Sequence, residues 1–307
     1  MTISLCCYCF CCFYSKYKSK TSSPNLGDAN RILQRNLIPF RPQYPQIIKP
    51  SLMLDTKVMK TKAADDVRKE LRSMADPVKA AILQRFFKTG PGQYGEGDLF
   101  MGIMVPHLRK ISKKFSQLRL GEIRTLLYSQ VHEERLVALL ILVCRYNSSS
   151  NSMKEKEEIV KFYLDNIQHV NNWDLVDMSA PYILGAHLMV DNNIGDRMQR
   201  LLLYKLAKSE NIWERRIAIV STHHFIRNGD FSDTLKIAEM LLHDRHDLIH
   251  KAVGWMLREV GKRDVAAEEA FLEKHWSIMP RTMLRYAIER LPESERHRYK
   301  KKPINKC

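Results

Sequence analysis

The sequence has little of what punctuates a β-rich fold. It holds only 12 Gly and 12 Pro in 307 residues, and almost no stretch alternates apolar and polar side chains as a strand does. The hydrophobic share of 45% is nevertheless enough for a sizeable core. These features favour a helical protein over a β-sandwich or a β-barrel.

Cysteine is scarce outside the first twelve residues. Five of the seven cysteines lie there, and only Cys144 lies in the body of the chain, with Cys307 at its end. A disulfide framework would distribute its cysteines through the fold, so we expect a reducing compartment, the nucleus or the cytoplasm. Cys144 follows an apolar run and is predicted to lie in the core.

Long hydrophobic runs are also missing. Residues 3–14 are apolar, but about twelve residues are too few to span a bilayer, so we expect no stable membrane insertion. Cysteines beside aromatic residues, followed by Lys16, Lys18 and Lys20, fit an S-acylation site. An unstructured tail explains them equally well. Five prolines between residues 24 and 50 break any helix there. We therefore assign residues 1–62 to a disordered basic, Cys-rich tail and residues 63–302 to the folded domain.

Acidic residues are the minority among the charged ones. The chain has 50 Lys/Arg and 34 Asp/Glu, a net charge of +16. Residues 1–62 contribute ten Lys/Arg and two Asp/Glu, a balance of +8, so the remaining chain is basic without them. A basic body favours a polyanionic partner, either nucleic acid or an anionic membrane surface. Surplus lysines that merely solvate helix faces would give the same balance.

Apolar residues recur at a helical period from about residue 65 onward. In 67–87 the period is interrupted at Asp76 and Pro77, a pair that fits an N-cap followed by proline at the first helical position. Residues 296–302 are predicted to be a solvated tail. Short connections predict that neighbouring helices pack antiparallel. Further helices are predicted at 105–115, 120–129, 132–146, 155–168, 172–190, 195–208, 210–228, 231–243, 247–262, 265–275 and 279–290.

Three of the four tryptophans follow a repeat. Trp173, Trp213 and Trp255 are 40 and 42 residues apart, and HEAT and armadillo arrays repeat at about 40–47 residues. Residues one period apart share one face of such an array, so the spacing predicts that these indoles line a common surface. The alternative is that each is a core residue of its own repeat, and we expect this for Trp213.

The polar neighbours of these tryptophans suggest a site for a cation. Trp173 and Asp177 are four residues apart and project from one helix face. The face of an indole attracts positive charge, and a carboxylate does so more strongly where water is excluded. Arg216 lies three residues after Trp213, and Arg258 three residues after Trp255.

Two other patterns carry less weight. Residues 90–95 match G-x-G-x-x-G, but they follow a predicted helix instead of a strand, so the dinucleotide interpretation fails and a helix-connecting loop near DNA is favoured. His243, His246 and His250 have helical spacing without a carboxylate or cysteine of fitting geometry, so no metal site is predicted.

The sequence from about residue 65 to 300 resembles the AlkD-type DNA alkylation repair glycosylases, which are HEAT-like repeat proteins. Several spaced blocks carry the resemblance in the same order: 95–103 (GEGDLFMGI), Val105-Pro106 with Arg109, 173–177 (WDLVD), 211–218 (NIWERRIA), 251–259 (KAVGWMLRE) and 279–287 (MPRTMLRYA).

The resemblance implies a fold and an activity. The fold would be all-α, a HEAT-like helical-repeat solenoid, or α-α superhelix, with a concave basic DNA-binding face. The activity would be hydrolysis of the N-glycosidic bond of cationic alkylated purines, 7-methylguanine and 3-methyladenine, in duplex DNA during base excision repair. The base would not need to flip into a protein pocket, no metal or other cofactor would be needed, and the enzyme would be a monofunctional glycosylase acting as a monomer.

The resemblance also implies roles for single residues. Asp177 would be the catalytic carboxylate, Trp173 and Trp255 would pack against the sugar and backbone of the damaged nucleotide, and Arg216 would contact the DNA backbone near the lesion. A developing oxocarbenium ion would be stabilised by the carboxylate, and no acid would be needed because the leaving base is already cationic. The further DNA-binding residues expected are Arg109, Tyr94, Arg215, Lys251, Arg258 and Arg285.

Two non-catalytic functions remain as alternatives. A HEAT array could grip bent or damaged DNA without chemistry, but this gives no reason for Asp177 because a carboxylate on a DNA-facing surface repels phosphate. A protein scaffold, the commonest role of HEAT arrays, would bind without preference for DNA.

Overall fold

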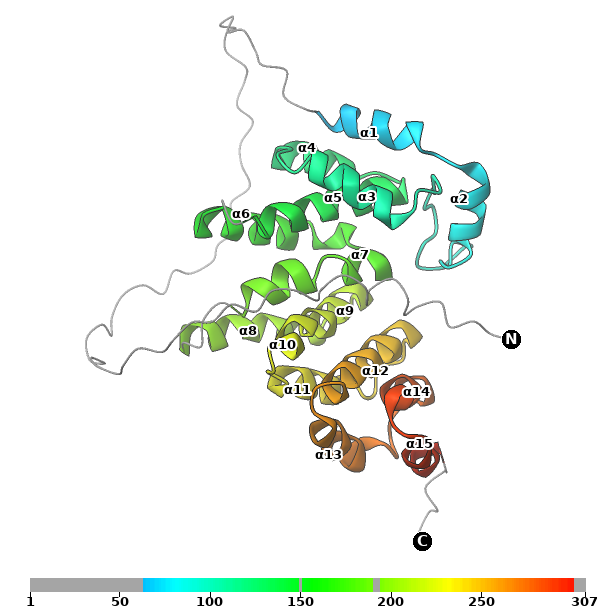
Figure 1. The fold of residues 1–307 in the computed structure, drawn as a ribbon, viewed down its shortest axis with the longest axis vertical. Coiled ribbons are helices and arrows are strands. Elements are labelled where there is room, and N and C mark those ends of the chain that lie inside the picture. Colours follow the sequence, from blue (N-terminus) through cyan, green and yellow to red (C-terminus); the bar gives the residue numbers. More distant parts are fainter. Residues whose placement is uncertain (1–62, 149–150, 190–193, 301–307) are drawn as a thin grey trace, which may run out of the picture. The chain divides into compact units, whose positions relative to one another are not determined.

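The described part of the molecule is entirely helical (Figure 1). The computed structural model describes residues 63–148, 151–189 and 194–300, within which the only β contact is an isolated bridge between Leu99 and Val131. The chain divides after Thr56 into two units, and all described residues belong to the second. The tail expected at 1–62, with its Cys-rich segment, lies outside the described residues. The prediction of an all-α domain is confirmed.

The α-helices are α1 (Ala64–Ser73), α2 (Pro77–Gln84), α3 (Val105–Lys114), α4 (Leu120–Leu127), α5 (His132–Tyr146), α6 (Met153–Asp165), α7 (Trp173–Asp177), α8 (Ile194–Ala207), α9 (Ile212–Ser221), α10 (His223–Arg227), α11 (Ser232–Met240), α12 (Asp247–Gly261), α13 (Val265–His275), α14 (Arg281–Ala287) and α15 (Glu293–Lys300).

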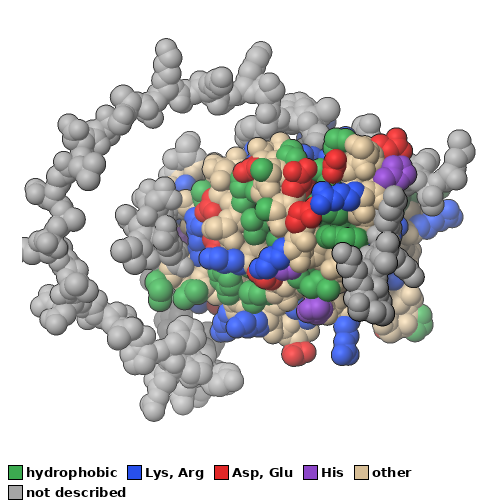
Figure 2. Space-filling view, turned by 90° about the horizontal axis from the view of Figure 1, so that it is seen from below, with side chains coloured by type: hydrophobic (Ala, Val, Ile, Leu, Met, Phe, Trp, Pro, Cys, Tyr) green, Lys and Arg blue, Asp and Glu red, His purple; other side chains and the backbone are tan. Residues whose placement is uncertain are grey.

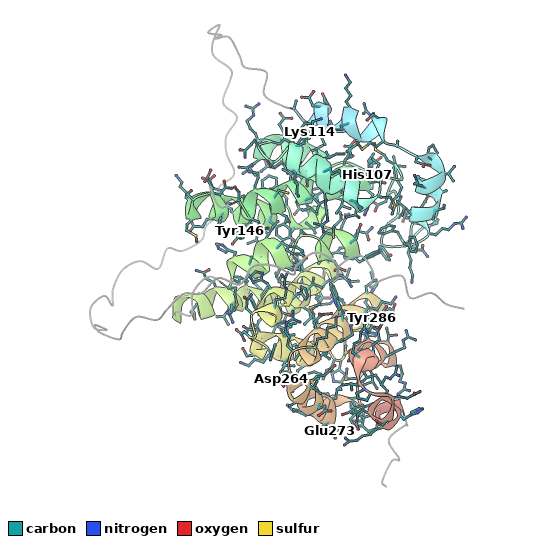
Figure 3. All side chains as sticks on the ribbon, viewed as in Figure 1. His107, Lys114, Tyr146, Asp264, Glu273 and Tyr286 are labelled. Atoms are coloured by element: carbon teal, nitrogen blue, oxygen red, sulfur yellow. The ribbon has the colours of Figure 1, made fainter. Side chains whose placement is uncertain are left out.

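The helices follow one another in chain order from α1 to α15 (Figure 1). Most contacts join elements close in sequence, such as α3 with α5, α8 with α9, α9 with α12 and α12 with α14. Side chains fill the space between successive helices (Figure 3). The buried apolar residues form one core cluster from Ala64 to Tyr299. Each helix therefore depends mainly on its neighbours for burial of its apolar face.

The segment 67–87 confirms the predicted helix start and adds an observation on burial. Asp76 caps α2 as predicted, because its carboxylate accepts hydrogen bonds from the backbone N–H groups of Val78 and Lys79, both at 3.1 Å. The apolar residues of this stretch recur at helical spacing, yet no residue of α2 is buried. Val78, Ile82 and Phe86 form an exposed stripe, with Val78 73% exposed.

Two long helices predicted from the sequence are interrupted. The helix expected at 172–190 breaks after α7, and a π-helical turn (Pro181–Gly185) follows. Proline has no N–H to continue the hydrogen-bond ladder, which explains the break. The helix expected at 210–228 is divided at Thr222, whose hydroxyl donates to the carbonyl of Ile219 at 2.7 Å. Such back-bonding bends helices.

The C-terminal region also differs from the expectation. The solvated tail predicted at 296–302 begins instead as helix α15. Tyr299 is only 1% exposed, donates to Glu273 at 2.9 Å and meets the ring of Trp276 edge-on. Tyr299 therefore packs the charged helix α15 against the rest of the domain. The run of basic residues around it gave no sign of this burial in the sequence.

The surface and the hydropathy add two observations. The face seen in Figure 2 intersperses Lys and Arg with Asp, Glu and hydrophobic side chains. Among the described helices, none combines the length and the apolar composition needed to cross a bilayer.

Candidate nucleic-acid site

Trp173 and Asp177 are the first and last residues of the short helix α7. They lie one turn apart and therefore project from the same side of it, as the sequence predicts. Asn172 caps the helix: its side-chain oxygen accepts the Trp173 backbone N–H at 2.8 Å, and Asn172 itself is fully buried. The break before Pro181 makes Asp177 a helix-terminal residue, so its side chain is placed by a short and firmly capped element.

The Asp177 carboxylate is paired with Arg216 of α9. Arg216 donates from Nε to Oδ1 at 2.9 Å and from Nη2 to Oδ2 at 2.8 Å, and its Nη1 donates to the carbonyl of Leu248 at 2.5 Å. The two side chains are 12% and 5% exposed. Burial raises the pKa of Asp177, while the charge and hydrogen bonds of Arg216 act to lower it. The parallel pair of bonds fixes the plane of the carboxylate.

The connection between α2 and α3 covers Trp173. Phe87 stacks on the indole with ring centroids 5.3 Å apart and planes inclined by 19°. The hydroxyl of Tyr94 interacts with the Trp173 side chain, and the ring of Tyr94 meets Trp213 edge-on at 5.6 Å. The loop 90–95, with its G-x-G-x-x-G pattern, thus joins two helices beside the site.

The three tryptophans do not occupy equivalent positions. Trp173 and Trp213 lie in the first turns of α7 and α9, whereas Trp255 lies in the middle of α12. Trp213 is 7% exposed, which confirms the expected core role. Trp255 is half-buried, donates from Nε1 to Glu259 at 3.2 Å and lies 5.6 Å from the ring of His223. Burial lowers the pKa of His223 to about 4, so this ring is neutral at pH 7.

The other predicted DNA contacts are placed in different surroundings. Arg109 donates from Nη2 to Sδ of Met178 at 3.7 Å, and Met178 is the residue after Asp177. Lys251 pairs with Asp247 on the surface of α12 and also acts electrostatically on Tyr94. Arg285 is exposed on α14.

Arg215 and Arg258 have partners within the fold. Arg215 donates to Asp244 at 2.6 Å and to two backbone carbonyls. Arg258 is 3% exposed and pairs with Glu289. Arg109 and Arg216 therefore lie close to Asp177 or its neighbour Met178. Arg215 and Arg258 instead form ion pairs with Asp244 and Glu289.

Sequence reasoning missed a charge cluster at the start of α5. His132 lies between two carboxylates, with Nε2 2.7 Å from Asp174 and Nδ1 3.6 Å from Asp98. Asp98 also accepts from Arg135 at 2.7 Å and from the amide of Asn172 at 3.2 Å. The one signal in the sequence was Asp98, which falls in the matched block 95–103.

The next two residues of α5 are also buried and paired. Glu133 accepts from the backbone N–H groups of Met101, Gly102 and Ile103, at 2.8 to 3.3 Å. Glu134 accepts from Arg68 of α1 at 3.0 Å. Four consecutive side chains at one helix terminus thus tie the 98–103 segment, α1 and α7 to α5.

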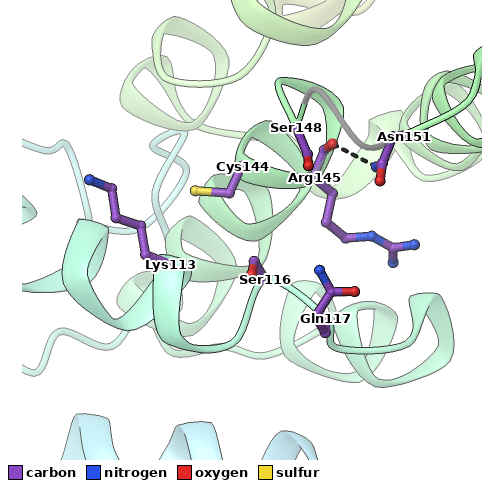
Figure 4. Close-up of a pocket in the computed structure, with 7 residues that line it drawn as sticks. All are labelled: Lys113, Ser116, Gln117, Cys144, Arg145, Ser148 and Asn151. Carbon is purple, nitrogen blue, oxygen red and sulfur yellow. Dashed lines mark hydrogen bonds between the residues drawn. The ribbon is translucent and has the colours of Figure 1, made fainter.

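The described residues offer no metal centre, because no group of three or more His, Cys, Asp or Glu among them is arranged to hold an ion. His246 caps α12 and His250 contacts the carbonyl of Asp244. A cavity of about 300 Å³ lies at the C-terminal ends of α3 and α5 (Figure 4). Cys144, expected in the core, is only half-buried at its edge and lies 3.5 Å from Ser112. This cavity is at the opposite end of α5 from His132.

Comparisons with known proteins cover most of the described domain. The family model for the DNA alkylation repair enzyme matches residues 67–291. In fold, the chain is similar to a solved structure described as a predicted DNA alkylation repair enzyme from Enterococcus faecalis, with a TM-score of 0.54 and 17% identity over 72% of this chain and 98% of that one. Among curated proteins no match is found. Since the matched segment makes up most of the sequence, the chain belongs to the DNA alkylation repair enzyme family.

Proposed function

We propose that the chain is a monofunctional DNA glycosylase of the AlkD type. It hydrolyses the N-glycosidic bond of cationic alkylated purines, such as 7-methylguanine and 3-methyladenine, in duplex DNA. One observation carries the proposal: an indole and a carboxylate lie one helical turn apart on α7, and Arg216 fixes the carboxylate. A scaffold or a purely DNA-binding array has no use for this arrangement.

The chemistry suits a single acid. A purine alkylated at a ring nitrogen carries positive charge, so it leaves without being protonated, and the bond to deoxyribose breaks toward an oxocarbenium-like sugar. The Asp177 carboxylate stabilises that cation and orients the attacking water. Each of its oxygens accepts one bond from Arg216 and retains a further lone-pair site for water.

Trp173 and Trp255 take the supporting roles in this proposal. Their partly exposed indoles pack against the sugar and backbone and add cation–π stabilisation. Arg216 acts first through Asp177, and its contact with the DNA backbone stays a prediction. Tyr94, Arg109, Arg215, Lys251, Arg258 and Arg285 stay the predicted DNA-binding residues, with phosphates as the partners of the cations.

The proposed arrangement of the fold follows from the same residues. The helix pairs would stack as HEAT-like units with a concave basic face that follows the DNA backbone, and the base would not enter a protein pocket. We propose that the protein works as a monomer without a cofactor. The contacts between helices close in sequence support such stacking.

A base-release assay tests the function. Purified full-length protein is incubated with methylated duplex DNA, and free 7-methylguanine and 3-methyladenine are measured beside a buffer control. Wild type is expected to exceed the spontaneous rate, and Asp177→Asn to fall close to it while binding to DNA survives. Asp165→Asn is the matched control, because this exposed carboxylate of α6 pairs with Lys161 of the same helix. Release by wild type at the spontaneous rate would remove the proposal.

A salt titration on duplex DNA separates the remaining alternatives. A DNA-binding protein loses affinity steeply with salt because it releases counterions from the phosphates. Salt-independent association, or none, would favour a protein scaffold instead.

A further inference from the structure

The most unusual polar group outside the proposed catalytic residues is His132. Its imidazole is 3% exposed and lies between Asp174 and Asp98. Two aromatic rings pack against it, with centroids 4.8 Å away for Phe87 and 4.9 Å away for Phe100, and these two rings lie 5.0 Å from each other. Nε2 is hydrogen-bonded to Asp174 at 2.7 Å. Nδ1, which has no hydrogen-bond partner among the described residues, lies at an ion-pair distance of 3.6 Å from Asp98.

The imidazole is connected to α7 through polar contacts. Asp174 is hydrogen-bonded to Nε2 of His132 at 2.7 Å and is the residue directly after Trp173. Asp98, on the other side of the ring, accepts from the amide of Asn172, the N-cap of α7. His132 therefore reaches both the cap and the first turn of the helix that carries Trp173 and Asp177.

An aromatic contact makes the same connection. Phe87 touches the ring of His132 at 4.8 Å and the indole of Trp173 at 5.3 Å. A shift of the imidazole would thus displace Trp173 in two ways: its backbone through Asp174, and its indole ring through Phe87. Since protein interiors are close-packed, such a shift has little free volume to absorb it.

We propose that His132 is a positioning residue: clamped between Asp98 and Asp174, it holds the first turn of α7 so that Trp173 and Asp177 keep the geometry needed for base release. The inference rests on the proposed function. His132 itself does not touch Asp177, whose partner is Arg216.

The charges around the ring support this role. The groups that face it are Asp174 from α7, Asp98 from the loop before α3 and Arg135 from α5. Although burial lowers the pKa of His132, the two carboxylates raise it to about 9. The ring is therefore an imidazolium at neutral pH, and two cations balance two anions in the cluster. Loss of the proton above pH 9 would weaken the clamp.

The first test measures base release by the full-length protein at saturating DNA under single-turnover conditions. His132→Gln removes the charge, and we expect the rate to fall up to roughly 100-fold, the loss that a misplacement of about 1 Å causes. DNA affinity should change little. Glu134→Gln is the matched control, because it breaks a buried ion pair with Arg68 on the same turn of α5 without a contact to α7. We expect it to keep close to the wild-type rate.

The second test follows Trp173 without any DNA. Quenching of tryptophan fluorescence by acrylamide should increase in His132→Gln, and the increase should vanish when the same change is made in a Trp173→Phe background. If wild type releases no base, the proposed function fails, but this measurement still decides whether His132 holds Trp173. If His132→Gln does not fold, Asp174→Asn tests the same contact from its other side.

Three results would overturn the inference. The first is release by His132→Gln at the wild-type rate. The second is an equal loss in Glu134→Gln, which would mean a general loss of stability. The third is an increase in quenching that persists without Trp173.

Discussion

Arg216 and Asp177 are 39 residues apart in the chain, yet they form two parallel hydrogen bonds of 2.9 and 2.8 Å. A third guanidinium nitrogen is held by the carbonyl of Leu248 at the start of α12. Because Arg216 is fixed on both sides, α7, α9 and α12 all determine where the Asp177 carboxylate points. The carboxylate belongs to the shortest of these helices and depends on the other two for its direction.

Replacement of Arg216 should change how base release depends on pH. Burial raises the pKa of Asp177, and Arg216 opposes that rise. In Arg216→Gln the opposing charge is gone, so the pKa of Asp177 rises further and the protonated, inactive form extends to higher pH. We expect the acidic limb of the rate–pH profile to move toward higher pH and the maximal rate to fall.

The control for this profile is Arg215→Gln. It removes a neighbouring arginine on the same helix whose ion pair is with Asp244. An acidic limb that stays in place in Arg216→Gln, or moves equally in Arg215→Gln, would contradict the pairing argument.

The His132 cluster should appear in the pH dependence of stability. The pKa of His132 is about 9 in the folded protein and 6.5 for an unperturbed histidine side chain, so the folded state binds the proton more tightly. The stabilisation is fully present below pH 6.5 and is lost as the pH rises through 9, on the order of 3 kcal/mol in all. Urea denaturation between pH 6 and pH 10 measures it.

His132→Gln supplies the comparison for that titration. Its free energy of unfolding should be lower than that of wild type at pH 6. Between pH 6.5 and 9 it should decrease much less than the free energy of unfolding of wild type does. The same decline in both proteins would show that other groups cause it.

Local sequence signals predicted those features that depend on neighbours in the chain. Asp76 and Pro77 identify a helix start because the cap and its acceptor groups are two and three residues apart. Trp173 and Asp177 share a helix face because four residues make about one turn. Most helices could therefore be predicted in approximate position, and so could the shared helix face of Trp173 and Asp177.

What could not be predicted depends on distant partners. The start of α5, residues 132–135, has the composition of a solvated first turn, but most of its side-chain partners lie 30 to 66 residues away. Nothing in the local composition marks these charges as buried. Burial could not be predicted for α2 either, because its apolar residues have helical spacing although none of them is buried. For α15, the single buried tyrosine was hidden among charged residues.

His223, whose ring lies beside Trp255, should lower the stability of the folded protein in acid. Burial lowers its pKa to about 4 in the folded protein, so the unfolded chain binds the proton more readily. Stability from this group is present above pH 6.5 and is lost as the pH falls toward 4. His223→Gln should be less sensitive to acid in urea denaturation between pH 7 and pH 4. His243→Gln, at an exposed position, should keep the wild-type profile, and equal behaviour of the two variants would refute the assignment.

Gly254 should be essential for the placement of Trp255. A Cβ at Gly254 would lie 2.3 Å from the carbonyl oxygen of Met283 and 2.6 Å from Cβ of Tyr286, the latter labelled on α14 in Figure 3. The first contact is with backbone, so Gly254→Ala must push α12 away from α14. We expect a loss of about 1–3 kcal/mol in the free energy of unfolding, the usual cost of overpacking.

The chain offers a matched control for this change in Gly121→Ala. Gly121 also lies in a helix, α4, but a Cβ there meets nothing within 4 Å, so alanine should stabilise by about 0.5–1 kcal/mol through the unfolded state. Urea denaturation measures the change in the free energy of unfolding for both variants. Changes of opposite sign would mean that glycine is required at 254 by the contact between α12 and α14, and not by helix propensity. A stabilised Gly254→Ala would show that the two helices separate at little cost, and Trp255 would then not be held by their close approach.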